Sequence, residues 1–257
     1  MSATTTNYNS LAGRRVLITG GASGIGAALV RAFVLQGSTV GFIDINKAAA
    51  DEVMASLAGE TAVMPTFLPC DLRNSEHVIA TVDRFAEAAG GIDVLVNNAA
   101  SDDRHGWEEL TPADWDDRLN INLKQQFFAA QAAARHMQPR RSGSIINFTS
   151  TSWILATGGD MIGYATAKAG VVGMTRTLAR LLGPHNIRCN AVAPGWIMTA
   201  KQRESRIDAA EQAALIERQC LKRLLYPDDV APLVLFLGAD DSAAITGQML
   251  IADGGIA

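Results

Sequence analysis

A tyrosine and a lysine four positions apart could act together on one reacting atom. Tyr164 and Lys168 close the stretch STSWILATGGDMIGYATAK, residues 150–168. If residues 164–182 form a helix, positions four apart share a face, so the ammonium of Lys168 lies beside the ring of Tyr164. A free tyrosine ionises near pH ~10, and a neighbouring cation stabilises its phenolate. The pair therefore predicts a general base with a lowered pKa, able to take the proton of a substrate hydroxyl.

A serine lies at the end of the apolar run before this pair. Ser150 follows residues 144–149 (SIINFT), which have the composition of a buried strand. Its hydroxyl could hydrogen-bond the same substrate oxygen. The Tyr-Lys spacing alone has a second interpretation, a solvated lysine beside a half-buried tyrosine. The rest of the chain has to decide between the two.

Composition restricts the class of protein. The 257 residues are 48% hydrophobic and 19% charged, which fits one soluble domain with one large core. The net charge of -4 and the lack of a long basic run argue against nucleic acid as partner. No apolar run approaches the ~18 residues of a membrane span. Residues 1–10 are polar, with neither a basic start nor an apolar stretch, and predict a loose arm rather than a targeting signal.

The cysteines and histidines show no site spacing. The three cysteines, Cys70, Cys189 and Cys220, are far apart, so neither a disulfide framework nor a zinc site is expected. This cysteine usage predicts a protein of the reducing cytoplasm. The four histidines are not spaced as ligands either, which predicts no metal.

A glycine-rich turn lies between a predicted strand, residues 15–19, and a predicted helix, residues 25–36. Glycines here let the backbone approach a pyrophosphate, whose charge the open N–H groups of the helix start favour. The order Thr-Gly-x-x-x-Gly-x-Gly fits the general dinucleotide template only loosely. The candidate cofactor-binding residues in this turn are Gly20, Ser23, Gly24, Ile25 and Gly26.

An acidic residue follows the second predicted strand, residues 39–43. Asp44 lies ~20 residues after the glycine turn, where a carboxylate can accept both hydroxyls of the adenosine ribose. It would repel the extra phosphate of NADP, and Ile45 and Asn46 supply no compensating cation. The sequence therefore predicts NAD in preference to NADP. The alternative is that Asp44 caps the next helix.

Further apolar runs alternate with helical stretches, at residues 66–70, 93–96, 188–192 and 247–252. This alternation predicts βαβ units and hence an α/β protein, with a Rossmann-like, doubly wound parallel sheet, helices on both faces and one domain. The ligand crevice should lie at the carboxyl ends of the strands.

Two segments stand out within this frame. A long helix is expected over residues 111–137; it contains Asn122, for which a polar contact at a helix interface is the alternative to a functional role. Residues 196–227 are charged and only partly helical, which is typical of a lid over substrate. The polarity of this segment favours a small polar substrate.

Taken together, these residues resemble the short-chain dehydrogenase/reductase family from Leu11 onward. The resemblance depends on the joint order of motifs along the chain. These are Thr19-Gly20-x-x-x-Gly24-x-Gly26, Asp71, Asn97-Asn98-Ala99, Asn122, Ser150, Tyr164-x-x-x-Lys168 and Pro194-Gly195. There are two departures: Ala100 stands where glycine is usual, and the gap from Ser150 to Tyr164 is one residue longer than is commonest.

The resemblance implies a role for each matching position. Tyr164 would be the base, Lys168 would lower its pKa and bind the nicotinamide ribose, and Ser150 would orient the substrate oxygen. Asn122 would hold a water that passes the proton outward. The other implied cofactor contacts are Asp71 to the adenine, Leu72, Asn98 and Ala99 on the adenosine side, Pro194 and Gly195, and Ile197 and Thr199 at the nicotinamide amide.

Within the family, the chain resembles bacterial aldose 1-dehydrogenases of the xylose dehydrogenase type. The matching pieces are residues 102–105 (DDRH), 152–153 (SW) and 219–222 (QCLK). Sugars need hydrogen-bonding groups and flat apolar surfaces. The candidate substrate residues are therefore Arg104, Ser150, Trp153, Asp160, Trp196 and Gln202. The tryptophans could equally be core or subunit interface, and residues 102–105 could be a polar loop.

The predicted reaction moves hydride from the anomeric C1 of an aldose to NAD and leaves a lactone. The alternatives are a polyol dehydrogenase, a ketone or oxoacyl reductase of the same family and, more remotely, a non-catalytic nucleotide-binding module. Apolar surface on the long helices, residues 115–137 and 164–182, suggests association. The resemblance implies a homotetramer.

Overall fold

Seven parallel strands form one sheet at the centre of the molecule. The computed structural model describes residues 6–156, 159–205 and 208–257. Within them the strand order is β3-β2-β1-β4-β5-β6-β7, and every neighbouring pair is parallel. The strands are β1 (Arg15–Thr19), β2 (Thr39–Asp44), β3 (Thr66–Pro69), β4 (Val94–Asn97), β5 (Gly143–Phe148), β6 (Ile187–Pro194) and β7 (Met249–Ala252).

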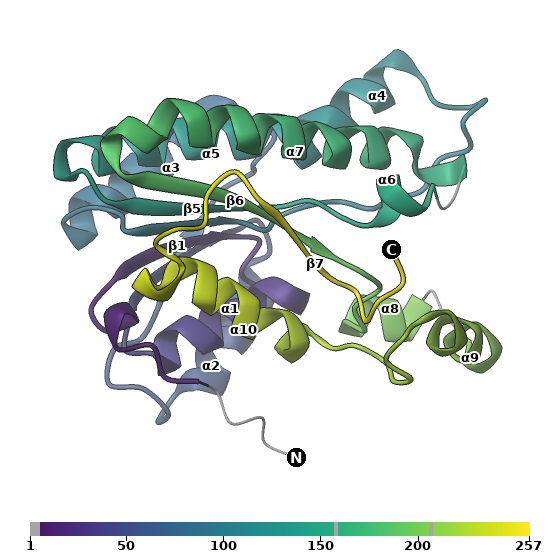
Figure 1. Cartoon of the computed structure of the whole chain (residues 1–257), viewed down its shortest axis with the longest axis horizontal. Coiled ribbons are helices and arrows are strands. Elements are labelled where there is room, and N and C mark those ends of the chain that lie inside the picture. The colour runs from purple at the N-terminus through teal and green to yellow at the C-terminus, as the bar shows by residue number, and fades with distance from the viewer. Residues whose placement is uncertain (1–5, 157–158, 206–207) are drawn as a thin grey trace.

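Helices cover both faces of this sheet. Figure 1 shows α3, α5 and α7 above it and α1, α2 and α10 below it. The long helices are α1 (Gly24–Leu35), α2 (Lys47–Leu57), α3 (Ser75–Ala89), α5 (Gln125–Met137), α7 (Ile162–Leu182) and α10 (Pro227–Gly238). The shorter ones are α4 (Pro112–Leu119), α6 (Ser152–Leu155), α8 (Ala200–Ser205) and α9 (Ala209–Arg218). The predicted single, doubly wound α/β domain is confirmed.

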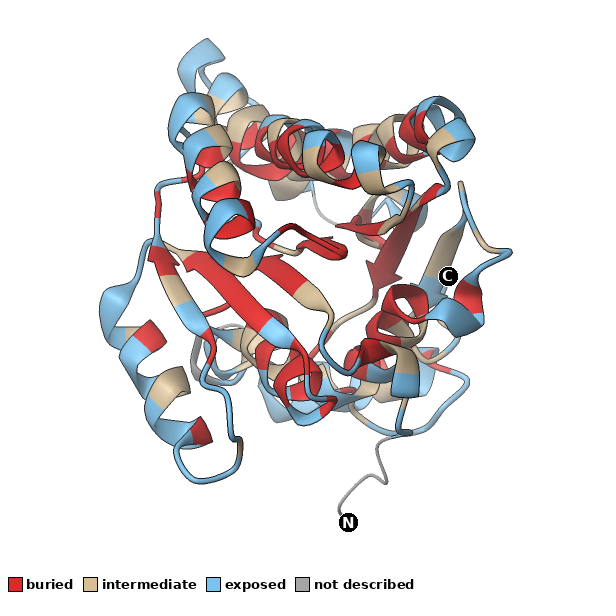
Figure 2. Cartoon of the chain, turned by 90° about the vertical axis from the view of Figure 1, so that its left-hand side faces the viewer, coloured by how far each residue is buried: buried red, intermediate tan, exposed pale blue. Residues whose placement is uncertain are grey.

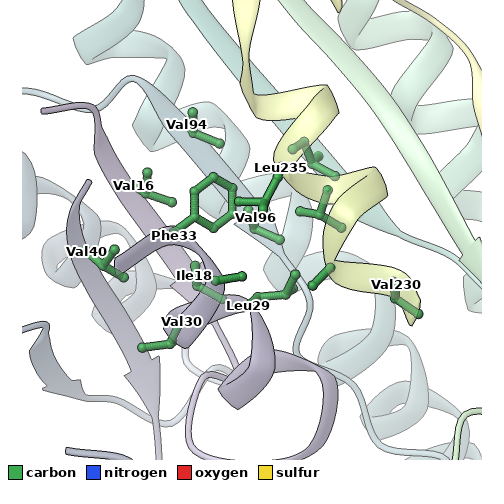
Figure 3. Close-up of a cluster of buried hydrophobic side chains, with 14 of the residues drawn as sticks. Val16, Ile18, Leu29, Val30, Phe33, Val40, Val94, Val96, Val230 and Leu235 are labelled. Atoms are coloured by element: carbon green, nitrogen blue, oxygen red, sulfur yellow. The ribbon is translucent and has the colours of Figure 1, made fainter. Parts of the chain in front are cut away.

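Alternate residues along each central strand enter opposite layers of the core. Val16 and Ile18 of β1 belong to the cluster between the sheet and helices α1 and α10, whereas Leu17 belongs to the cluster between the sheet and helices α3 and α5. Figure 3 shows Phe33 of α1 among the valines of β1 and β4 and Leu235 of α10. In Figure 2 the strands are mostly buried and the outer helix faces exposed. Burial on both faces explains why these strands have continuous apolar sequences.

Local caps set where the helices begin. The hydroxyl of Thr111 accepts from the amide of Asp114 at 3.2 Å, and the Asp114 side chain accepts from the amide of Thr111, while Pro112 opens the helix. Asn74 accepts from the first amides of α3, which ends at left-handed Gly90. Such caps satisfy N–H and C=O groups that a helix leaves open at its ends.

The helix predicted over residues 111–137 is interrupted. After α4, residues Asn120–Lys124 form a π-helical turn before α5 continues. Asn122 lies in this turn and is fully buried. A π turn adds one residue to the helical repeat and rotates the side chains that follow it, a feature frequent at functional sites.

The predicted loose arm is only partly outside the described residues. Residues 6–10 are attached to the domain, because Gln36 accepts from the amide of Tyr8 at 2.7 Å and donates to the carbonyl of Thr6 at 3.1 Å. Tyr8 also packs against the core beneath α1. These contacts make the term "loose" wrong for residues 6–10. No helix in the described part of the chain is long and apolar enough to cross a membrane.

Candidate active site

A cavity of about 720 Å³ opens at the carboxyl edge of the sheet. Residues that follow four parallel strands line it: Gly20 after β1, Asn98 after β4, Thr149 after β5 and Gly195 after β6. In Figure 1 this edge lies on the side of α6 and α8. The position agrees with the rule that open α/β sheets bind ligands beyond the carboxyl ends of their strands.

The first two turns of α7 bring Tyr164 and Lys168 into the cavity wall. The Lys168 amine lies 5.6 Å from the centroid of the Tyr164 ring. It donates to the carbonyl of Phe148 at 2.8 Å, and the side chain of Lys168 is almost fully buried. The hydroxyl of Thr149 donates to the carbonyl of Lys168 at 2.6 Å. These bonds fix the start of α7 against the end of β5.

Ser150 joins the pair at the same wall. Its hydroxyl accepts from the amide of Ser152 at 3.1 Å and also hydrogen-bonds Tyr164. Ser150, Tyr164 and Lys168 all line the cavity. The three groups expected to act on one substrate oxygen are thus brought together.

The ionisation of this group differs from the expectation that Lys168 lowers the pKa of Tyr164. Burial raises the pKa of Tyr164 to about 12, Ser150 acts in the lowering direction, and the charge of Asp102 raises it further. Burial also lowers the pKa of Lys168 to about 7. Removing both groups from water disfavours both charged forms, so Lys168 is too weak a cation to outweigh the desolvation of the phenol.

Asn122 supports the site from outside the cavity. Its side chain accepts from the amide of Ser101 at 3.0 Å and donates to the carbonyls of Ser101 and Arg118, each at 3.0 Å. The π turn thereby holds the start of the loop that follows β4. The side-chain amide is engaged with main chain, which favours its alternative interpretation as a polar contact over direct binding of a relayed water.

A buried amide network behind the catalytic group was not anticipated from the sequence. Asn97 donates to Asn147 at 2.9 Å, and Asn147 donates to Thr175 of α7 at 3.0 Å. Gln126 donates to the carbonyl of Phe148, the carbonyl that also accepts from Lys168. Because all these groups are buried, each bond is costly to lose. The network ties β4, β5, α5 and α7 together at the active edge.

The glycine turn forms a cradle at the start of α1. Gly20 and Gly24 have φ of +68° and +53°, a region that favours glycine. A Cβ on Gly26 would lie 1.8 Å from the carbonyl oxygen of Gly20. Ser23 occupies the N-cap position of α1 without a side-chain bond to the helix, and the first turn has no acidic residue. The open N–H groups suit an anion such as a pyrophosphate.

Asn98 holds this cradle in place. Its amide donates to the carbonyls of Thr19 and Gly20, each at 3.1 Å, and the hydroxyl of Thr19 accepts from the amides of Asn98 and Ala99. Of the residues on the adenosine side, Ala99 and Leu72 also line the cavity. Asn98 therefore positions the backbone of the glycine cradle.

Asp44 lines the other end of the cavity and does not cap α2. The cap is Asn46, whose side chain accepts from the amide of Ala49. The Asp44 carboxylate accepts from the amides of Ala22 and Asn46, each at 3.0 Å. The capping alternative is thereby excluded. Asp71, at the same end, accepts from the amide of Arg73 and stays half exposed.

The remaining predicted cofactor contacts form the opposite wall. Pro194, Gly195, Ile197 and Thr199 all line the cavity. A Cβ on Gly24 would lie 3.0 Å from the methyl group of Thr199, so the glycine cradle and this wall approach each other closely.

The predicted substrate residues divide into two groups. Arg104, Trp196 and Gln202 line the cavity, as does Ser150. Trp153 donates through its indole to the hydroxyl of Thr149 at 3.2 Å. Asp160 pairs with Arg104 at 3.1 Å. Four predicted site residues are not among the described residues that line the cavity: Gly26, Asn122, Trp153 and Asp160.

The structure adds polar cavity residues that the sequence did not single out. Asp102 and Lys201 line the wall beside Trp196 and Gln202 and form an ion pair of 2.9 Å. Both lie in segments noted for their charge, but nothing in the sequence connects positions so far apart. In the described part of the chain, no group of three or more His, Cys, Asp or Glu side chains is placed to hold a metal ion.

The cavity as a whole fits a dinucleotide better than a small ligand. It runs from Asp44 and Asp71, past the open helix start, to Lys168 and Tyr164. Carboxylate, anion site and buried amine thus follow one another in the order of ribose, pyrophosphate and second ribose. The residues present are therefore able to hold a nicotinamide dinucleotide.

Comparison with known proteins agrees with this geometry. Residues 20–257 match the family described as Enoyl-(Acyl carrier protein) reductase. The chain is 46% identical to the "Probable galactose dehydrogenase GalD" of Rhizobium meliloti over 100% of both chains. It is also 46% identical to the "D-xylose 1-dehydrogenase" of Caulobacter vibrioides, over 96% of this chain and 97% of that one.

A solved structure shows the same fold. The crystal structure of a 3-oxoacyl-[acyl-carrier protein] reductase from Brucella melitensis superimposes with a TM-score of 0.89 at 30% identity. The match covers 100% of this chain and 98% of that one. The similarity to all three proteins therefore extends over nearly the whole chain, including every element that lines the cavity.

Proposed function

This chain belongs to the short-chain dehydrogenase/reductase family, a family of nicotinamide-dependent oxidoreductases, and on that premise we propose that it oxidises C1 of an aldose with NAD to give a lactone. The observation that carries the proposal is that one cavity joins the glycine cradle to Tyr164, Ser150 and Lys168. The aldose is supported by two relatives whose names state galactose and xylose dehydrogenase activity.

The residues present suit the holding of the cofactor. Asp44 would accept the adenosine ribose hydroxyls, the open start of α1 would receive the pyrophosphate, and Lys168 would donate to the nicotinamide ribose. Ile197 and Thr199 would face the nicotinamide amide. The bound cofactor supplies a hydride acceptor and a positive ring. A cation beside Tyr164 stabilises the phenolate, which offsets the burial that otherwise raises its pKa.

The protein's own groups handle the proton. Tyr164 removes the proton of the anomeric hydroxyl while C1 loses its hydride, so the C1–H bond breaks and C1 becomes the lactone carbonyl. Ser150 donates to the same oxygen and holds it against the phenol. An anomeric hydroxyl suits this base, because it is more acidic than an ordinary alcohol and the ring oxygen stabilises charge that develops at carbon. The products are lactone, NADH and one proton.

A substrate panel tests the proposal. NADH formation would be followed with pentoses, hexoses, deoxy sugars, polyols and simple alcohols. The expected result is a higher kcat/KM for at least one aldose than for any polyol. Equal or greater activity on polyols would reject the aldose.

A second candidate is reduction of an oxoacyl or other ketone substrate. It is favoured by the name of the matching family and by the Brucella melitensis structure. Consumption of NADH or NADPH with an acetoacetyl thioester, faster than any sugar is oxidised, would establish it. A non-catalytic module is disfavoured, because Tyr164, Lys168 and Ser150 are all present and all face one cavity.

Preference for NAD depends on the carboxylate of Asp44. The variant Asp44→Asn keeps an acceptor for the amide of Ala22 but loses the charge. Hydrogen bonds to a charged group are worth ~1.5–3 kcal/mol, so KM for NAD should rise about 10- to 100-fold while KM for NADP falls. An unchanged ratio of the two KM values would assign the preference elsewhere.

We further infer a homotetramer working in the cytoplasm. The large exposed hydrophobic side chains of α5 and α7, Phe127, Ile162 and Leu181, support association. The cysteines are all free, which supports a reducing compartment. Sedimentation of the purified protein at several concentrations measures the first of these.

A further inference from the structure

Two segments about a hundred residues apart in sequence meet at the cavity wall. Asp102 comes from the loop after β4, and Lys201 and Gln202 come from α8. Lys201 lies 2.9 Å from one carboxylate oxygen of Asp102, and Gln202 donates to the other at 3.3 Å. All three residues line the cavity that contains Tyr164.

Asp102 acts electrostatically on the catalytic phenol. Its negative charge is one of the causes that raise the pKa of Tyr164, after burial. Coulomb energy is larger in a cavity shielded from water than in bulk solvent, and both residues line the same cavity. The carboxylate is therefore part of the wall that surrounds the space beside the phenol.

Two polar atoms without a hydrogen bond belong to residues of the same cavity wall. The Gln202 side-chain oxygen and the Trp196 indole nitrogen are buried and make no hydrogen bond. One is an acceptor and the other a donor. If the Gln202 amide were reversed, its oxygen would face the Asp102 carboxylate, and two acceptors would meet. The bond to Asp102 therefore fixes the orientation of the Gln202 amide. Unpaired buried polar groups beside a ligand cavity are complementary to polar groups on the ligand.

We propose that Asp102 is the residue that selects a polyhydroxy substrate, by accepting hydrogen bonds from substrate hydroxyl groups. This rests on the proposed function. A carboxylate only accepts, so its ligand must donate. A sugar or polyol offers hydroxyls around the reacting carbon, whereas an oxoacyl chain offers carbonyl oxygens and methylenes there. The latter would bury Asp102 against acceptors, which is costly.

Lys201 is the positioning partner of this carboxylate. Its amine pairs with the carboxylate and links the loop after β4 to α8. Exposure of the Lys201 side chain is 54%, against 26% for Asp102, so the amine lies nearer to solvent than the carboxylate does. The geometry thus leaves the carboxylate, rather than the amine, as the group directed at substrate.

The test compares Asp102→Asn with Asp103→Asn. Both variants remove one negative charge without changing side-chain shape. Asp103 bonds to Ser101 and Arg118, lies 3.7 Å from the amine of Lys201 and does not line the cavity among the described residues. Each protein would be assayed with the best aldose and with its 2-deoxy and 6-deoxy forms. Each would also be titrated with the same sugars as its NADH complex, following fluorescence, which reports binding without turnover.

Asp102→Asn should lower kcat/KM for the parent aldose about 10- to 100-fold and weaken binding to the NADH complex by a similar factor. For at least one deoxy sugar the substitution should lower kcat/KM much less than it does for the parent aldose, because the hydroxyl that this sugar lacks is the one that Asp102 binds. Asp103→Asn should stay within about 3-fold of wild type. An equal fall in kcat/KM for the parent aldose and all its deoxy forms, or no fall for the parent, would overturn the role of Asp102.

The same experiment separates this role from the proposed function. If wild type oxidises a polyol and no aldose, the aldose proposal fails, and the polyol with its deoxy forms tests Asp102 in the same way. If wild type acts only on an oxoacyl thioester, both are rejected.

Discussion

The two walls of the cavity are built in different ways. On the cofactor side, main chain does the positioning: Gly20 and Gly24 take left-handed backbone, and a methyl at Gly26 would collide with a carbonyl oxygen at 1.8 Å. On the substrate side, side chains do the positioning: Asp102 is held by Lys201 and Gln202, which lie about a hundred residues away in the sequence.

This difference explains which substitutions each wall of the cavity tolerates. Backbone geometry at a glycine turn tolerates almost no substitution, so the cofactor wall has a fixed spacing that can be read as a motif. Ion pairs between partly exposed side chains contribute little to stability and can be replaced one at a time. The substrate wall is therefore where members of one fold family can differ in specificity.

The largest effect should come from the group between the walls. Tyr164→Phe removes the phenol oxygen and keeps the ring that Lys168 approaches. General acid-base groups contribute ~10²–10⁴-fold, so kcat should fall about 1000-fold while the NADH affinity stays within a few-fold. NADH formation and a fluorescence titration with NADH measure the two. Retained turnover would remove Tyr164 from the role of base.

A methyl group at the glycine turn should damage the cofactor wall next most. Gly26→Ala must displace the Gly20 carbonyl or the start of α1, since both are main chain. Overpacking costs ~1–3 kcal/mol, and we expect a lower Tm and at least about 10-fold weaker NADH binding.

The matched control lies in α7. Gly173 is exposed, and a Cβ there meets nothing within 4 Å. Gly173→Ala should leave NADH binding unchanged and raise the free energy of unfolding by about 0.5–1 kcal/mol, because alanine loses less entropy in a helix. Equal effects of the two changes would contradict a backbone-built cofactor wall.

Stability should depend on pH through Lys168. Burial lowers its folded-state pKa from 10.5 to about 7. Between these values the unfolded chain holds a proton on this amine that the folded chain lacks, so the free energy of unfolding rises with pH. The raised pKa of Tyr164 works the other way, because above pH 10 only the folded chain keeps the phenol proton.

Urea unfolding at about pH 7.5 and about pH 9 checks the Lys168 window. Wild type should gain on the order of 1 kcal/mol per pH unit relative to Lys168→Met, which has no amine to titrate. The same pH slope in both proteins would show that the amine stays charged in the fold.

The smallest effect should come from the pair on the substrate wall. Lys201→Ala should change the free energy of unfolding by less than about 1 kcal/mol, because the lysine is 54% exposed. It should nonetheless raise KM for the sugar while leaving KM for NAD unchanged. A large drop in Tm would mean that this wall, too, is part of the rigid frame.

The sequence predicted the fold because the central strands are buried on both faces. Their apolar runs identify all seven to within a few residues. The glycine turn and the four-residue spacing of Tyr164 and Lys168 are local features, so their proximity followed from helix geometry alone.

What could not be predicted depends on tertiary contacts. The π turn at Asn122 has no signal in its residue types, and the pKa of Tyr164 is set by burial that a sequence does not show. Trp153 was predicted beside the substrate; its indole donates to Thr149, and among the described residues it does not line the cavity. The contact between Asp102 and Lys201 joins the loop after β4 to α8, and only the fold determines that these two segments approach each other.

Isotope transfer tests the central claim most directly. An aldose carrying deuterium at C1 would be incubated with the enzyme and NAD, and the reduced cofactor analysed by mass spectrometry. Oxidation at the anomeric carbon predicts that the deuterium is recovered in the reduced cofactor, in amounts equal to the lactone formed. Reduced cofactor without deuterium would place the reacting hydroxyl on another carbon and contradict the account.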